Sequence, residues 1–254
     1  MALTKIGKEG ITGISNSSDA NVITIDSSER VGINTNDMNS YYSKNLVLSV
    51  PDAEGGITIV SPTTSGSYLM FADGTTGDER YRGYVEYSHT SDYLGFATSG
   101  TLRMKIDSVG HVTNPYQSAF SASLGSIQTN PANASRVAFN SEIFDQNADY
   151  DTSIYVFTAP VTGKYFLSFS IRIDAPDSAA DYVRFNLNTS NRGYNSSIFD
   201  LGNLSGDPNY WNMQTAVLAD MDAGDTAEVE FVFAGGAQQT DISTESYFTG
   251  CLVC

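Results

Sequence analysis

Short runs in which apolar and polar residues alternate dominate this chain of 254 residues. In the clearest run, residues 165–174, large apolar residues recur at every second position from Tyr165 to Ile173. Residues 183–187 and 229–233 repeat the pattern, which is typical of strands with one buried and one wet face. Gly, Asn, Asp and Ser separate the runs, and no apolar stripe with a helical period is evident. The sequence therefore predicts a nearly all-β protein.

The first half of the chain carries shorter strand patterns. Period-two apolar faces occur within residues 46–50, 57–59 and 102–106, with glycine-containing turns between them. Aromatic-rich segments at residues 81–87 and 93–96 flank a polar loop and predict a further strand pair. We expect hairpin elements in this half.

A weak internal repeat also occurs in the first half. Residues 25–33 and 106–112 both begin with Ile-Asp-Ser and continue to a Val, as the modules of a stalk would, although two such elements can agree by chance. Asn114-Pro115 then interrupts the strand pattern, and the sequence beyond is richer in Phe. We therefore expect a lead segment over residues 1–24, a β-rich stalk module over residues 25–115 and a β-sandwich over residues 116–254.

The charge balance excludes some classes of partner. With 13 Lys+Arg against 29 Asp+Glu, the net charge is −16, so the surface repels a nucleic-acid backbone. The first residues contain no apolar signal-peptide core, and no later stretch is long enough to cross a bilayer. We expect neither nucleic-acid binding nor membrane insertion.

The motifs of common enzymes are missing from the sequence. The chain has two histidines and no His-Glu-x-x-His, Gly-x-Ser-x-Gly or phosphate-binding-loop motif. The sequence therefore predicts a protein that is not an enzyme. A glycan hydrolase needs only two well-placed carboxylates and stays as a minor alternative.

An acidic segment after residue 144 is the candidate metal site. It spaces oxygen donors at alternate positions, namely Asp145, Asn147, Asp149 and Asp151, as a Ca²⁺ loop does. Tyr150 stands where an EF-hand needs Gly, and the twelfth position is Val156 instead of Glu, so an EF-hand is rejected. A solvated acidic loop is the favoured interpretation, and Ca²⁺ is the one candidate cofactor.

Two polar segments rich in aromatic residues are the candidate receptor-binding loops. They are residues 191–195 and 203–212, and their candidate contact residues are Arg192, Tyr194, Tyr210 and Trp211. Tyr and Trp offer large contact area at small entropic cost and stack on sugar rings. The alternative is that Trp211 folds back onto the sandwich.

Three segments in the second half resemble the C1q/TNF-like superfamily. They are residues 157–169 (Phe-Thr-Ala-Pro-Val-Thr-Gly-Lys-Tyr-Phe-Leu-Ser-Phe), 218–229 and 246–252. Cys251 departs from the family, which usually has an aromatic residue there. Over residues 116–254 the resemblance implies a C1q-like jelly-roll head that trimerises around an apolar axis. Heads of this kind sometimes bind Ca²⁺ near that axis, which makes the loop at residues 145–151 a candidate.

Segments in the first half are similar to modules of bacteriophage tail fibres and other virion appendages. Residues 87–96 and 101–112 resemble paired elements of such modules, and Val31-Gly32-Ile33-Asn34-Thr35 resembles the turn that follows them. The resemblance implies a three-chain stalk, with residues 1–24 as the virion-attachment segment.

Together these patterns predict a trimeric virion fibre or adhesin whose C-terminal head binds the host surface. Its expected partners are two further copies of itself, tail or capsid proteins at its N-terminus, and a host cell-surface glycan or protein. It would be assembled in the host cytoplasm and located in the virion. The alternative is a purely structural head-fibre, decoration or tail-connector protein, in which the C1q-like domain is a trimerisation cap.

Overall fold

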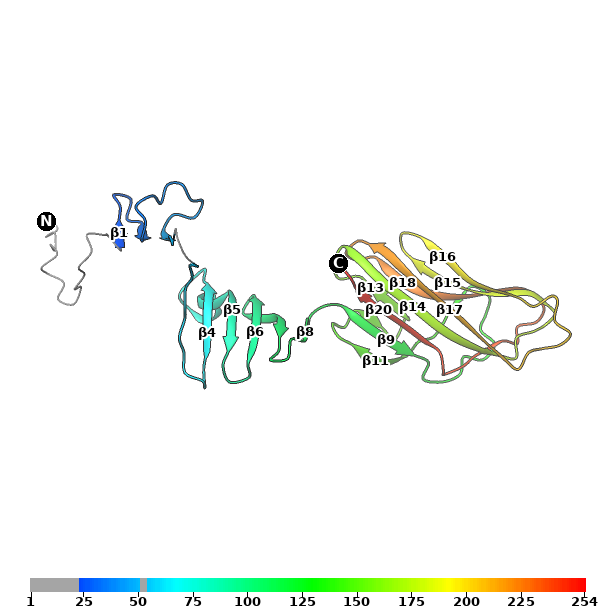
Figure 1. Ribbon diagram of the computed structural model, residues 1–254. Helices are drawn as coiled ribbons and strands as arrows, with labels where there is room; N and C mark the ends of the chain where they lie inside the picture. The colour runs from blue at the N-terminus through cyan, green and yellow to red at the C-terminus, as the bar shows by residue number, and fades with distance from the viewer. Residues whose placement is uncertain (1–22, 51–53) are drawn as a thin grey trace, which may run out of the picture. The chain divides into compact units, whose positions relative to one another are not determined.

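The computed structural model describes residues 23–50 and 54–254 of the chain (Figure 1). Its internal contacts divide it into two units, Met1–Ser67 and Tyr68–Cys254, which are described separately. Within these described residues, the regular structure is all strand apart from one short 3-10 helix, η2 (Gly77–Tyr81), as predicted. The expected attachment segment lies outside the described residues except for its last two positions, and the division at residues 24 and 115 stays a prediction. Within the described ranges, no helix is long and apolar enough to cross a bilayer.

The first unit contains a small three-stranded sheet. It is formed by β1 (Ile23–Ile25), β2 (Val31–Ile33) and β3 (Leu46–Leu48), with β1 antiparallel and β3 parallel to β2. One face is covered within the chain, because Val47 and Met38 are buried. A Cβ on Gly32 would lie 2.7 Å from Met38 Sδ, so a glycine is needed for Met38 to close over the sheet. The strand predicted at residues 57–59 is absent: its residues pair with no strand and Ile57 is exposed.

The second unit begins with a five-stranded sheet in the order β4-β5-β6-β7-β8. The strands are β4 (Gly66–Phe71), β5 (Gly83–Ser88), β6 (Tyr93–Thr98), β7 (Thr101–Ile106) and β8 (Val112–Thr113). They confirm the strands predicted at residues 93–96 and 102–106, whereas the segment predicted at residues 81–87 begins in η2 and becomes β5 from Gly83.

The two faces of this sheet differ in chemistry. On one face Tyr68 and Tyr93 donate hydrogen bonds to Glu86, at 2.9 and 3.2 Å. The register places apolar residues on the other face, here called the stalk apolar face: Leu69, Phe71, Val85, Leu94, Phe96, Met104, Ile106 and Val112. None of these eight residues is buried. A single layer with an open apolar face lacks the second layer that stabilises β domains.

The two segments that begin with Ile-Asp-Ser form the same kind of turn, and the modular repeat itself stays a prediction. In the β1–β2 turn, Asp26 Oδ1 accepts hydrogen bonds from the amides of Ser28 and Arg30, at 2.9 and 3.1 Å. In the β7–β8 turn, Asp107 Oδ1 accepts them from the amides of Val109 and His111, at 3.0 and 2.9 Å. The residue three positions after each Asp has a positive φ, 61° at Glu29 and 93° at Gly110. Each Asp therefore folds a five-residue turn between two short strands.

The C-terminal domain is the predicted two-layer sandwich (Figure 1). One sheet has the order β12-β13-β18-β15-β16, with β10 paired to β18, and its strands are β10 (Ser135–Arg136), β12 (Tyr150–Asp151), β13 (Val156–Thr158), β15 (Ala180–Thr189), β16 (Gly193–Asp200) and β18 (Thr226–Gly235). The other has the order β11-β9-β20-β14-β17, with β19 paired to β14, and its strands are β9 (Ala119–Ser123), β11 (Ser141–Asp145), β14 (Gly163–Asp174), β17 (Tyr210–Met221), β19 (Asp241–Ile242) and β20 (Tyr247–Leu252).

The core lies between these two sheets. Every second residue of β14 from Tyr165 to Ile173 is fully buried, which confirms the predicted core face. Tyr165 also closes the turn that precedes β14, because its hydroxyl donates to the carbonyl of Val161 at 2.7 Å. Gly250 in β20 allows the sheet to pack closely, since a Cβ there would meet Leu167 Cδ2 at 2.6 Å.

Candidate functional site

The sheet that contains β14 exposes a row of apolar side chains on the face that points away from the core. Leu218 of β17 lies opposite Phe166 of β14, and Phe166 lies opposite Cys251 of β20. We call these three residues the apolar row. Leu218 is 60% exposed and Phe166 is 42% exposed. Because apolar surface is stabilised by removal from water, the row is a candidate contact surface.

Smaller side chains follow the apolar row along the same strands. Ser168 and Ser170 of β14, with Gln214 and Tyr247 from the neighbouring strands, line an open hollow of about 350 Å³. The face then becomes charged at the far end of β14, where Arg172 pairs with Glu245 at 2.8 Å. The outward face therefore grades from apolar to polar along β14.

Sequence reasoning missed the apolar row, although a signal for it was present. Residues 168–174 alternate between buried apolar and outward polar positions, but Phe166 occupies an outward position. An aromatic residue on the wet face of an otherwise alternating strand is the exception that marks this surface.

The predicted aromatic candidates Tyr210 and Trp211 open strand β17 instead of lying in a loop. The Trp211 ring stacks on Phe199, with ring centroids 4.2 Å apart and planes 8° apart. Trp211 is opposite Ile173, a fully buried residue, so it points toward the core side at the rim of the sandwich. Tyr210 is exposed, and its ring centroid is 5.1 Å from the guanidinium carbon of Arg172. Trp211 is nevertheless 46% exposed, so its role in binding and the alternative in which it folds back onto the sandwich both stay predictions.

The other predicted pair, Arg192 and Tyr194, lies at the β15–β16 turn and the start of β16. Arg192 is exposed and its guanidinium is 2.9 Å from the carboxylate of Asp220. Tyr194 is half-buried and packs against the core. Arg192 remains accessible, whereas much of Tyr194 is occupied by packing.

The four candidate receptor residues do not form one site within a single chain. Arg192 contacts Asp220, which is ten residues along β17 from Tyr210. At about 3.3 Å per strand residue, the two pairs are about 33 Å apart. The receptor-binding assignment of these residues stays a prediction, and it would require two separate contact points.

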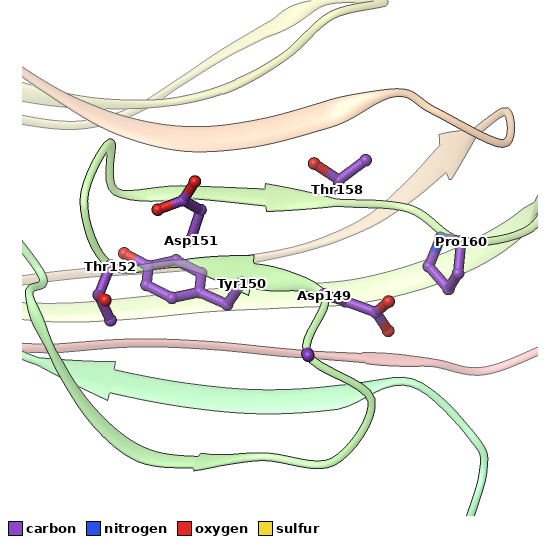
Figure 2. Close-up of a pocket in the computed structure, with 7 residues that line it drawn as sticks. Asp149, Tyr150, Asp151, Thr152, Thr158 and Pro160 are labelled. Atoms are coloured by element: carbon purple, nitrogen blue, oxygen red, sulfur yellow. The ribbon is translucent and has the colours of Figure 1, made fainter.

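Two of the four metal candidates, Asp149 and Asp151, line an open hollow of about 460 Å³ (Figure 2), whereas Asp145 and Asn147 do not. Asp145 accepts hydrogen bonds from the amides of Asp149 and Tyr150, at 3.1 and 2.8 Å, so its carboxylate already holds the loop closed. Asn147 donates to the carbonyl of Tyr116 at 2.9 Å. These bonds give Asp145 and Asn147 a role in shaping the loop.

The carboxylates of Asp149 and Asp151 do not point toward a common site. Figure 2 shows those of Asp149 and Asp151 pointing in different directions. The hydroxyl and amide of Ser153 donate to Asp151 and lower the pKa of its carboxyl. Among residues 23–50 and 54–254, no three His, Cys, Asp or Glu side chains are grouped as a metal site requires. The Ca²⁺ assignment thus stays a prediction, and the geometry fits a hydrogen-bonded loop better.

The sandwich matches a known family by sequence. The family model described as "C1q domain" matches residues 119–253, just over half of the chain. The chain belongs to the C1q domain family. No curated protein matches the chain. The jelly-roll sandwich of residues 119–253 is therefore the C1q domain of this chain.

Solved structures of C1q-like and TNF-like proteins are similar to this domain. The globular domain of zebrafish complement 1qA is 16% identical, with a TM-score of 0.42, over 54% of this chain and 98% of that one. Murine APRIL is 11% identical, with a TM-score of 0.41, over 54% and 99%. Eiger TNF from S. frugiperda is 11% identical, with a TM-score of 0.40, over 54% and 91%.

Proposed function

We propose that this chain is a subunit of a homotrimeric bacteriophage virion fibre, in which the C1q domain contacts the host surface and acts by binding. The observation that carries the proposal is the apolar row, which a lone sandwich leaves in water. C1q-like and TNF-like domains typically mediate trimerisation and binding, and a closed trimer would bury the row. Three weak sites on one particle then gain strength through multivalency.

The N-terminal half supports the fibre part of the proposal. Its sequence is similar to phage appendage modules, and the stalk apolar face is open on the single chain. Association of three chains would give this face the second layer that it lacks. The N-terminal end would attach to other virion proteins, which leaves the C1q domain as the distal head.

Light-scattering mass of the full chain is the first test. We expect three times the subunit mass of 27.3 kDa, with and without added Ca²⁺. A monodisperse monomer at micromolar concentration would overturn the proposal, because neither the head nor the stalk would then cover its apolar surface.

A purely structural virion protein is the second candidate, and the separation of the receptor candidates favours it. Tyr194 packs against the core, the Trp211 ring stacks on Phe199, and the two pairs are about 33 Å apart along β17. In this case the C1q domain would serve only as a trimerisation cap. Saturable binding of the fluorescently labelled trimer to host cells, competed by the unlabelled trimer, would favour the adhesin; a trimer without such binding would favour the cap.

A further inference from the structure

The sheet of the first unit has one face built only of aliphatic side chains. The strand register forms two rows across the sheet, which contain Ile23, Ile33 and Leu48 and then Ile25, Val31 and Leu46. We call these six residues the aliphatic face. The four on β1 and β3 are between 39% and 70% exposed. The opposite face has its own cover in Met38, whereas the residues that the structure describes leave the aliphatic face largely open.

The aliphatic face carries no charge of its own. Asp26 and Arg30, which adjoin Ile25 and Val31 in the sequence, form an ion pair with each other, and Arg30 also donates to Asn39 at 2.9 Å. Two copies of a chain with a net charge of −16 repel each other over most of their surface. At an uncharged apolar face, two such copies can approach each other without repulsion between like charges.

The repeated turn presents the same pair of side chains in both modules. Ile25 is opposite Val31 at the β1–β2 turn, and Ile106 is opposite Val112 at the β7–β8 turn. In each module this Ile–Val pair belongs to the open apolar face. The chain therefore uses the same kind of hairpin twice, with the same Ile–Val pair on the open face. We expect the same kind of molecule to pack against both faces.

We infer that the aliphatic face packs against the same face of further copies of the chain, so that the N-terminal sheet is a second self-association module. This inference rests on the proposed trimer. Six residues per chain are far fewer than the roughly 20–30 residues per side of a stable independent interface. A separate protein would not be held by this face alone. Copies already joined by their heads meet at a high effective concentration, for which a small face suffices.

Hydrogen exchange of the full chain tests this inference. Ile25→Asp places a charge on the aliphatic face, and Ser28→Asp places the same charge in the exposed turn of the same hairpin as its control. We expect Ile25→Asp to speed exchange of the amides of residues 23–48 at least tenfold, with less than a twofold change for Ser28→Asp. The light-scattering mass should stay that of the trimer in both variants.

Photocrosslinking identifies the chain that packs against the aliphatic face. Ile25 is replaced by p-benzoylphenylalanine, and isotope-labelled and unlabelled chains are reassembled as mixed trimers. Irradiation should join a labelled to an unlabelled chain within residues 23–48. Crosslinks that stay within one chain, for instance to residues 1–22, would overturn this inference. Equal exchange rates in Ile25→Asp and Ser28→Asp would overturn it as well. Either result would leave the proposed trimer intact. A monomeric wild-type mass would instead overturn the proposed function.

Discussion

Substitution of Leu218 by Ala tests whether the apolar row is the surface that joins the heads. Complete burial of a Leu side chain stabilises by about 1.5–3 kcal/mol. Leu218 is 60% exposed in the single chain, so its burial in a closed trimer would contribute about 1–2 kcal/mol per subunit and about 3–5 kcal/mol per trimer. The half-dissociation concentration varies with the square root of the trimer dissociation constant, so it should rise by about tenfold to seventyfold.

The control is Ile198→Ala. Ile198 is 64% exposed on the outward side of β16, in the other sheet, so the two side chains are equally accessible in a single chain. Sedimentation velocity over a dilution series gives the half-dissociation concentration of each variant. We expect the shift for Leu218→Ala alone. Equal behaviour of the two variants would refute the assignment of the row to the interface, even if the wild-type protein is a trimer.

Four further changes test the packing and the loops. Gly250→Ala should lower the free energy of unfolding by about 1–3 kcal/mol in denaturant melts, because its Cβ would crowd Leu167; an unchanged value would contradict the close-packing account. Trp211→Ala should lower the free energy of unfolding by about 1 kcal/mol, because it removes the ring that stacks on Phe199. An unaltered melting temperature would show that the stack contributes nothing. Hydrogen bonds from a backbone amide and a serine hydroxyl lower the pKa of Asp225, so its stabilisation is present above its ordinary value of 3.8 and is lost as the pH falls through the lower folded value. The difference in melting temperature between wild type and Asp225→Asn should therefore be present at neutral pH and vanish in strong acid, and a difference that persists in acid would contradict this origin. Ca²⁺ should leave the melting temperature unchanged, because Asp145 already accepts amide hydrogens; a saturable rise would restore the metal assignment.

The core of the C-terminal domain was predictable because its information is local. The period-two pattern that ends at Ile173 states which side of β14 is buried, whatever strands lie beside it. The turn at residues 160–163 was equally readable, since Pro and Gly limit the backbone there and Tyr165 closes it. For the buried face of β14, sequence pattern and tertiary structure therefore agree.

Long-range pairing explains what the sequence did not predict. Ile57 and Ile59 alternate like a strand, yet a strand needs a neighbour to take its backbone hydrogen bonds, and these residues have none. Tyr210 and Trp211 were expected in a loop because of the polar residues before them. Their pairing with Asp174 and Ile173 extends β17 over them instead, and that register involves residues almost forty positions earlier in the chain.

The exceptions to alternation carry the information about assembly. Phe166 is apolar at an outward position of its strand, and β1 to β3 carry apolar residues on a face that the described part of the chain leaves open. A monomer would gain nothing from either feature, because exposed apolar surface adds no stability and promotes association. In the proposed homotrimer both would become buried positions, and the same alternation rule would then hold for the assembly. A test of the oligomeric state therefore also tests why these residues are apolar.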